Sequence, residues 1–181
     1  MRYTLSEGPH RLTMTSPLRL VLIGLGNMLR RDDGVGLWVV QHFPAHNFPG
    51  IKRVPIGIAD PVALARAWDG ADIAWIIDAL KGPWPPGTIV RFRWRCFHQL
   101  CREHRFSTHA LPLDEAMALA LLLKPAPSHI AVYGVVGRDF SCGEGLSAEV
   151  KASARRLLRR LERLTTRIFA SSPAEVANPN R

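Results

Sequence analysis

Short apolar runs alternate along the chain with segments in which apolar residues recur every three or four positions. Three runs are typical of strands buried on both faces of a sheet: 18–24, 72–78 and 130–136. A weaker run at 51–57 contains Pro55, which predicts a short strand or an edge strand. Apolar and polar residues alternate over 88–94, with Arg91 and Arg93 on one face, which predicts a strand with one solvated face.

Helices are predicted between and after these runs, at 35–43, 60–70, 112–123 and 147–169. Asp60 is placed to cap the second helix, with Pro61 at its first position. Ser147 is placed to cap the last helix, whose apolar stripe consists of Val150, Ala154, Leu157, Leu158, Leu161 and Leu164. The alternation predicts an α/β fold: one domain with a twisted, mostly parallel sheet of about five strands and helices on both faces.

The predicted domain occupies residues 18–169, between a flexible extension at 1–17 and a disordered tail at 170–181. The composition of the 181-residue chain, 47% hydrophobic and 22% charged, is that of a globular protein. No apolar run approaches the length of about 18 residues that a membrane span needs, so no membrane segment is expected. Three cysteines without a CxxC pair favour free thiols and a cytoplasmic protein over a disulfide framework or a thiolate zinc site.

Arginine supplies most of the net charge of +9, since the chain has 20 arginines and four lysines. The last predicted helix carries Arg155, Arg156, Arg159, Arg160, Arg163 and Arg167. Such a face attracts an acidic protein or nucleic acid, although helical periodicity alone also makes it an ordinary solvated face. No aromatic residue is interleaved with these arginines to stack on bases, so we do not expect nucleic acid as the partner.

Three residues with catalytic or metal-binding potential follow predicted strands or precede a helix. In parallel sheets, ligands bind outside the carboxyl ends of the strands, and Asp33, Asp78 and His109 are all expected at that edge. Two carboxylates and an imidazole bind a divalent metal such as zinc or nickel. Without a metal, the same groups provide acid–base catalysis, and the sequence leaves both possibilities open.

Each candidate also has a purely structural interpretation. Asp32 and Asp33 precede the helix at 35–43, where Asp32 would cap the helix and Asp33 would complement its dipole. Only one of the two acids can occupy the cap position, which leaves Asp33 available for another role. Asp78 would form an Asx turn at a strand end, and His109 would form a hydrogen bond at a helix start.

Several other motifs are absent or incomplete. The turn that begins at Gly24 lacks the third glycine of a dinucleotide loop, because Leu29 stands there, and no Walker lysine follows. Neither a GxSxG elbow nor an HExxH zinc motif occurs, and Cys142 has no local signature of a nucleophile. A tight strand-to-loop turn is therefore at least as good an interpretation of the glycines as phosphate binding.

Four segments together resemble the hydrogenase maturation proteases: LIGLGNMLRRDDGVGLWVV (22–40), WIIDALKGPWPPGTIVRF (75–92), STHALPLDEAMALA (107–120) and IAVYGVVGRDFSCGEGLSAEV (130–150). The resemblance extends over about residues 18–165. It implies an endopeptidase, usually classed as aspartic-type, that removes the C-terminal extension of a nickel–iron hydrogenase large-subunit precursor after nickel insertion. It also implies that Asp33, Asp78 and His109 sense nickel in that precursor.

The resemblance carries further expectations about nickel and partners. Three ligands without a thiolate form an incomplete shell, so the isolated protein is expected to bind metal weakly, and the nickel to be that of the precursor. The precursor is the expected partner of a monomeric enzyme. Many family members have an Asp-Gly-Gly-Thr-like stretch after the second strand, and here only Gly57 of the 54–60 segment matches it. The type of hydrogenase is therefore left open.

Two other functions compete with this interpretation. Peptidyl-tRNA hydrolases also open with a GLGN turn and are basic, but the one His-Asn pair here, His46-Asn47, lies in a proline-bounded segment. A non-catalytic maturation chaperone that binds nickel or the partner on the same fold is the second alternative. The altered 54–60 segment favours it, whereas the presence of all three candidate residues favours an enzyme.

We predict that the arginine face steers an acidic partner and raises the association rate more than the affinity. Reversing Arg156, Arg159 and Arg163 to Glu should slow encounter with the precursor at low salt and leave cleavage of bound precursor unchanged. Stopped-flow association and single-turnover cleavage measure the two steps separately. Normal association with lost cleavage would instead place these arginines in the catalytic machinery.

Overall fold

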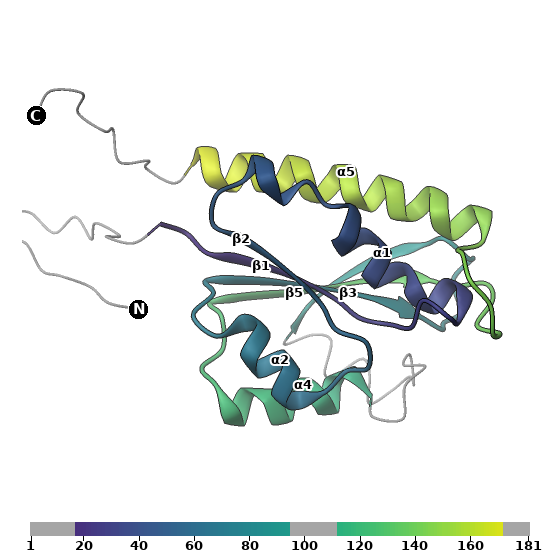
Figure 1. The fold of residues 1–181 in the computed structure, drawn as a ribbon, viewed down its shortest axis with the longest axis horizontal. Helices are drawn as coiled ribbons and strands as arrows, with labels where there is room; N and C mark the ends of the chain where they lie inside the picture. Colours follow the sequence, from purple (N-terminus) through teal and green to yellow (C-terminus); the bar gives the residue numbers. More distant parts are fainter. Residues whose placement is uncertain (1–16, 95–111, 172–181) are drawn as a thin grey trace, which may run out of the picture.

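The computed structural model describes residues 17–94 and 112–171 (Figure 1). Within these ranges the strands are β1 (Leu20–Gly24), β2 (Ile51–Pro55), β3 (Ile73–Leu80), β4 (Ile89–Arg93) and β5 (His129–Val136). The α-helices are α1 (Val35–His42), α2 (Pro61–Trp68), α4 (Leu113–Leu123) and α5 (Ala148–Ala170). Two 3₁₀ turns, η1 (Arg31–Gly34) and η2 (Ala45–Asn47), flank α1.

The strands form one sheet in the order β2-β1-β3-β5-β4. All neighbouring pairs are parallel except β4 and β5, which are antiparallel. β2, the strand that ends at Pro55, lies at one edge, as its composition predicts, because an edge strand tolerates a residue without an N–H donor. The predicted α/β class with a mostly parallel sheet is thus confirmed.

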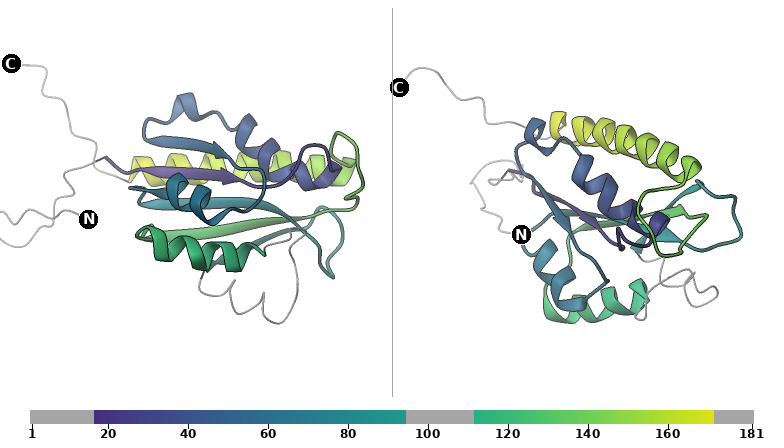
Figure 2. Two further views of the ribbon diagram at one scale, coloured as in Figure 1. Left: turned by 60° about the horizontal axis from the view of Figure 1, so that its bottom comes forward. Right: turned by 45° about the vertical axis from the view of Figure 1, so that its right-hand side comes forward.

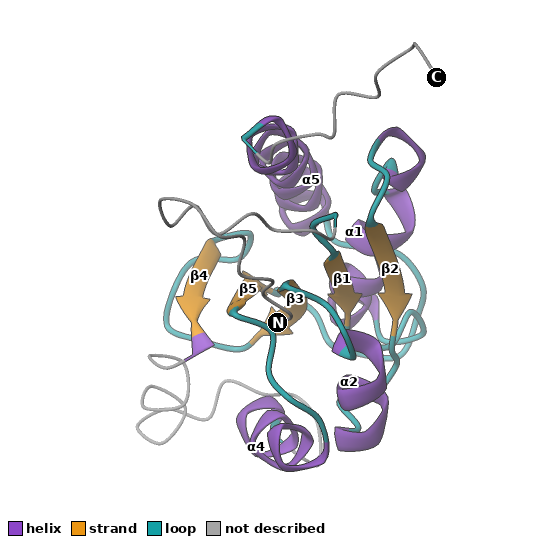
Figure 3. Ribbon diagram, turned by 90° about the vertical axis from the view of Figure 1, so that its left-hand side faces the viewer, coloured by secondary structure: helices purple, strands orange, loops and turns teal. Residues whose placement is uncertain are grey.

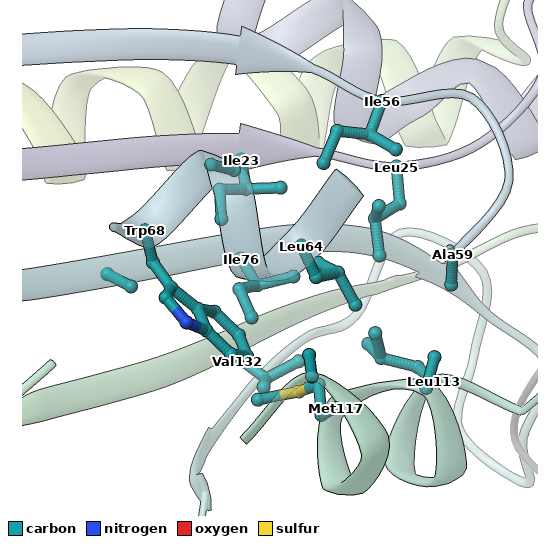
Figure 4. Close-up of a cluster of buried hydrophobic side chains, with 14 of the residues drawn as sticks. Ile23, Leu25, Ile56, Ala59, Leu64, Trp68, Ile76, Leu113, Met117 and Val132 are labelled. Carbon is teal, nitrogen blue, oxygen red and sulfur yellow. The ribbon is translucent and has the colours of Figure 1, made fainter. Parts of the chain in front are cut away.

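Helices cover both faces of the sheet, as Figure 3 shows when the strands are viewed end-on. α1 and α5 lie on one face, and α2 and α4 pack against each other on the opposite face. The α2–α4 face buries Trp68 among apolar residues of the sheet and α4, including Ile76, Val132 and Met117 (Figure 4). The α1–α5 face buries a second cluster that contains Trp75, Tyr133, Phe43, Leu157 and Leu161.

The predicted helix signals have mixed outcomes. Asp60 caps α2 as expected, because its Oδ1 accepts a hydrogen bond of 2.7 Å from the amide of Ala63. Ser147 directly precedes α5, but its side chain makes no capping hydrogen bond, and its hydroxyl instead donates to Asp32. The predicted stripe of α5 faces the sheet, with Leu158 and Leu164 partly buried and the others buried. Ser147 thus occupies the predicted cap position, although its side chain binds Asp32 instead of the helix, and the buried stripe is confirmed.

The exposed face predicted for 88–94 is partly covered. Val90, Phe92 and Trp94 pack on the α2–α4 side, as expected. Arg91 lies on the α5 side, where its guanidinium carbon is 5.9 Å from the centre of the Tyr133 ring. A polar residue in an alternating strand is therefore no guarantee of a fully solvated face.

The predicted segments 1–17 and 170–181 fall almost wholly outside the described residues. α5 extends through Ala170, one residue beyond the predicted domain boundary. Among the described helices, none has the length and apolar character needed to cross a membrane.

The end of β1 and the start of α1 approach each other through two glycines. A Cβ on Gly24 would lie 2.4 Å from the carbonyl oxygen of Gly36. A Cβ on Gly36 would lie 2.3 Å from the carbonyl oxygen of Ile77 and 2.4 Å from that of Leu25. Backbone atoms occupy the space that a side chain would need, so this close approach requires glycine at both positions.

We predict that Gly36→Ala lowers the free energy of unfolding by about 1–3 kcal/mol through overpacking. In a helix without such a contact, alanine is more stable than glycine by about 1 kcal/mol. A loss of stability in Gly36→Ala would therefore show the effect of the backbone contact, and a gain would speak against it. Gly57→Ala is the matched control, because the nearest atom to its added Cβ would be 4.0 Å away. Urea denaturation measures the free energy of unfolding of both variants. Equal stability of the two variants would contradict the prediction.

Candidate active site

Asp33 and Asp78 both lie at the carboxyl edge of the sheet. This edge is the side where the parallel strands β1 and β3 end, and it is distinct from the outer strands β2 and β4. Asp33 belongs to η1, which follows the loop after β1 and contacts β3. Asp78 is the sixth residue of β3 and pairs with Gly134 of β5. β3 continues through Leu80, because Ala79 and Leu80 remain paired with Val135 and Val136. The expectation that Asp78 ends its strand is therefore wrong by two residues, whereas its expected edge of the sheet is correct.

The Asp33 carboxylate is held by the loop that precedes it. Its Oδ2 accepts a hydrogen bond of 3.0 Å from the amide of Asn27, and the residue is only 1% exposed. Gly26 makes this fold possible, because its φ is +120° and a Cβ there would lie 1.8 Å from the carbonyl oxygen of Asp33. The glycine-rich segment is thus a tight turn that packs directly against Asp33.

Asp78 is equally buried, at 1% exposure. Its Oδ1 accepts a hydrogen bond of 2.8 Å from the amide of Ala79. Side chains alternate along β3, which places Asp78 on the same face as Ile76 and Leu80, the face that α2 and α4 cover. A carboxylate among apolar neighbours depends on its hydrogen bonds to stay buried, and buried carboxylates are typical of functional sites.

Backbone contacts connect the two acidic segments. The amide of Leu25 donates to the carbonyl of Ile77 over 2.9 Å, one residue before Asp78. His109 lies outside the described residues, four positions before the first residue of α4. Among the described side chains, no group of three His, Cys, Asp or Glu residues is arranged to hold a metal. The three-residue site therefore stays a prediction, of which two members are positioned at one edge.

Asp32, the residue before Asp33, is a fully buried carboxylate near this edge. It accepts four hydrogen bonds: from the amides of Arg138, Asp139 and Ser147 at 2.8, 2.9 and 2.7 Å, and from the Ser147 hydroxyl at 2.9 Å. The predicted role of Asp32 as a helix cap is wrong, because Gly34 occupies that position without a side-chain cap. Its charge instead fixes the 137–147 loop against η1.

Further backbone hydrogen bonds hold the same two segments together. The amide of Gly143 donates to the carbonyl of Leu29, and the amide of Arg31 donates back to the carbonyl of Gly143, both over 2.9 Å. Arg31 adopts φ 46°, and its side chain pairs with Asp139. Hydrogen bonds from Ser141, with a smaller contribution from the Arg31 charge, lower the pKa of Asp139. In Figure 2 the green 137–147 loop lies beside the purple and blue turn before α1.

Sequence reasoning missed this role of Asp32 because all its partners lie more than 100 residues away. The available signal was the pair of adjacent acids, of which only one could cap a helix. That signal indicates a spare carboxylate but does not identify which acid binds the loop. The structure assigns the loop contacts to Asp32 and the Asn27 contact to Asp33.

Comparison with known proteins identifies the family. The chain matches the family model of the hydrogenase maturation proteases (HycI) over residues 60–164, more than half of its length. The chain therefore belongs to the hydrogenase maturation protease family, a family of peptidases. Asp78 and His109 fall within the matched range, and Asp33 precedes it.

Individual relatives agree with this assignment. The chain is 27% identical over 123 residues to the hydrogenase expression/formation protein HupD of Thiocapsa roseopersicina, covering 67% of this chain and 56% of the relative. It is 27% identical to HoxM of Azotobacter vinelandii over 148 residues, covering 81% of this chain and 71% of the relative. The match thus spans little more than half the length of HupD.

Two solved structures share the fold. The [NiFe] hydrogenase maturation protease HybD of Thermococcus kodakarensis superposes with a TM-score of 0.69 at 26% identity, covering 82% of this chain and 99% of that protein. The hydrogenase maturating endopeptidase HybD of E. coli gives a TM-score of 0.71 at 20% identity, covering 83% and 94%. The second comparison supports the fold alone.

We predict that Asp32→Asn lowers the free energy of unfolding by about 2–4 kcal/mol, because it removes a buried charge from four donors. Amide hydrogen exchange at Arg138, Asp139 and Ser147 should accelerate together. Asp69→Asn is the control: its ion pair with Lys124 is exposed and should contribute less than about 1 kcal/mol. Unchanged exchange in the loop would contradict the assigned role of Asp32.

Proposed function

We propose that this protein is an endopeptidase that removes the C-terminal extension of a nickel–iron hydrogenase large-subunit precursor after nickel insertion. One observation carries the proposal: two buried carboxylates, Asp33 and Asp78, lie at the carboxyl edge of the sheet in a chain of the maturation protease family. The names of its relatives, which refer to hydrogenase maturation and formation, support the substrate class.

In the proposed site, Asp33, Asp78 and His109 contact the nickel centre of the bound precursor. Carboxylate oxygens and imidazole nitrogen are suitable ligands for that ion. The Asn27 amide holds the Asp33 side chain in place before the substrate arrives, and the β3 ladder does the same for the Asp78 backbone. Because these groups are already held in place, binding of the precursor does not have to pay the entropic cost of ordering them. The same carboxylates would act as acid and base in an aspartic-type hydrolysis.

The surface around this edge supports a protein substrate. Leu29 and Ile58 are 62% and 65% exposed, although both are large apolar residues, and Met28, which precedes Leu29, is also exposed. Their segments are connected by a hydrogen bond of 2.8 Å from the amide of Gly26 to the carbonyl of Gly57. Apolar side chains beside buried acids provide contact area for an extended peptide.

We further propose that the protein acts as a cytoplasmic monomer and holds no tightly bound metal of its own. The free, exposed Cys142 agrees with a reducing compartment. Nickel is then part of the substrate. An incomplete set of three ligands suits a protein that recognises a metal already held by its partner.

A direct test uses nickel-loaded precursor and follows the loss of its C-terminal extension by mass spectrometry. We predict that Asp33→Asn, Asp78→Asn and His109→Gln each reduce the cleavage rate by about 10²–10⁴-fold, the range for loss of an acid–base group. Asp69→Asn is an exposed carboxylate control that should cleave normally. Thermal denaturation of each variant separates loss of catalysis from loss of folding.

The same experiment tests the chaperone alternative, which the altered 54–60 segment favours. Asp60 there caps α2, so it is not available as the family acid of that segment. A chaperone would bind the precursor without shortening it, and the three substitutions would weaken binding only. Precursor that is bound but never cleaved by the unmodified protein would overturn the endopeptidase proposal.

A further inference from the structure

A pocket lies where β3 and β5 begin, at the end of the sheet opposite to Asp33 and Asp78. It has a volume of about 350 Å³, within the range of small-molecule sites. Its floor includes Ile73 and His129, the first residues of the parallel strands β3 and β5. One wall is α5, which contributes Arg160, Leu164 and Ile168 at successive spacings of four residues.

Apolar side chains form much of this pocket. Trp75 and Ile73 come from alternate positions of β3, so both face α5. Leu164 and Ile168 approach from the helix and are only partly buried. These four side chains provide walls for an apolar group of a ligand.

Two arginines line the same pocket. Arg91 pairs with Tyr133 across β4 and β5, and Arg160 comes from α5. Among residues 17–94 and 112–171, neither guanidinium forms an ion pair with a carboxylate. Two positive charges from different elements thus meet beside an apolar surface without a described counter-ion, an arrangement that favours an anionic ligand.

Tyr133 gives independent support. Its side chain is fully buried beneath the pocket, and its hydroxyl proton has no acceptor within the described part of the chain. Burial raises the pKa of this phenol, although the charge of Arg91, a hydrogen bond from its side chain and the charge of Arg160 oppose the rise. A buried donor without an acceptor is costly, and a ligand oxygen would remove that cost.

We propose that this pocket binds an organic carboxylate that carries an apolar group. Arg91 and Arg160 would bind the carboxylate, with the Tyr133 hydroxyl as a further donor, and the apolar group would contact Trp75 and Leu164. The planar guanidinium matches the geometry of a carboxylate. Either a free aromatic or aliphatic acid or the C-terminal residue of a peptide has this chemistry. The assignment stands independently of the proposed peptidase activity.

Binding is tested by calorimetry and by tryptophan fluorescence, since Trp75 lines the pocket. The probe is 4-phenylbutyrate, and its neutral amide is the matched ligand without charge. We expect the acid to bind about tenfold tighter or more than the amide, as for charge-assisted hydrogen bonds. Equal affinity for acid and amide would overturn the proposal.

Variants locate the site. Arg160→Met removes the charge with little loss of side-chain length and should abolish the preference for the acid. Arg163→Met is the control, because Arg163 is an exposed residue of the same helix that does not line the pocket. Retention of the full acid preference in Arg160→Met would contradict the assignment. Circular dichroism of both variants verifies folding.

Two additional ligands identify the source of the carboxylate. N-acetyl-Leu-Leu, compared with its C-terminal amide, represents a peptide terminus. Tighter binding of the peptide acid than of 4-phenylbutyrate would assign the pocket to a chain end, and the reverse order would assign it to a free acid. If phenyl phosphate binds more tightly than both acids, the carboxylate assignment is wrong.

Discussion

A carboxylate that leaves water needs hydrogen-bond donors for its oxygens, and Asp32 obtains four from the 137–147 loop. This interaction connects the turn after β1 with the segment between β5 and α5. Asp33 is the next residue along the chain, so its position depends on where Asp32 is held. The edge of the sheet that carries the candidate site is therefore organised by an acid that belongs to the scaffold.

The close packing of backbone at this edge of the sheet also helps to fix the position of Asp33. Gly24 and Gly36 allow α1 to begin directly against β1 and β3, and Gly26 allows the turn to contact Asp33. Side chains at these positions would push η1, which carries Asp33, away from β3, which carries Asp78. Small residues and one buried charge thus fix where Asp33 lies relative to the end of β3.

Much of this architecture could be predicted from sequence because its signals are local. Apolar runs identified the buried strands, Pro55 indicated the edge strand, and Asp60 with Pro61 identified the start of α2. The same reasoning placed Asp33 and Asp78 at the correct edge of the sheet, but it missed the contact between Asp32 and Ser147. Their mutual hydrogen bonds span 115 residues, and local patterns contain no information on such a contact. The placement of His109 with the two acids stays a prediction.

The distance in sequence between Asp32 and its donors has a consequence for biosynthesis. During translation Asp32 leaves the ribosome 106 residues before Arg138 and 115 before Ser147. These donors do not yet exist while the first part of the chain is made, so the loop that carries Asp33 lacks this restraint at that stage. The full set of four hydrogen bonds can form only after Ser147, at the start of α5, has been synthesised.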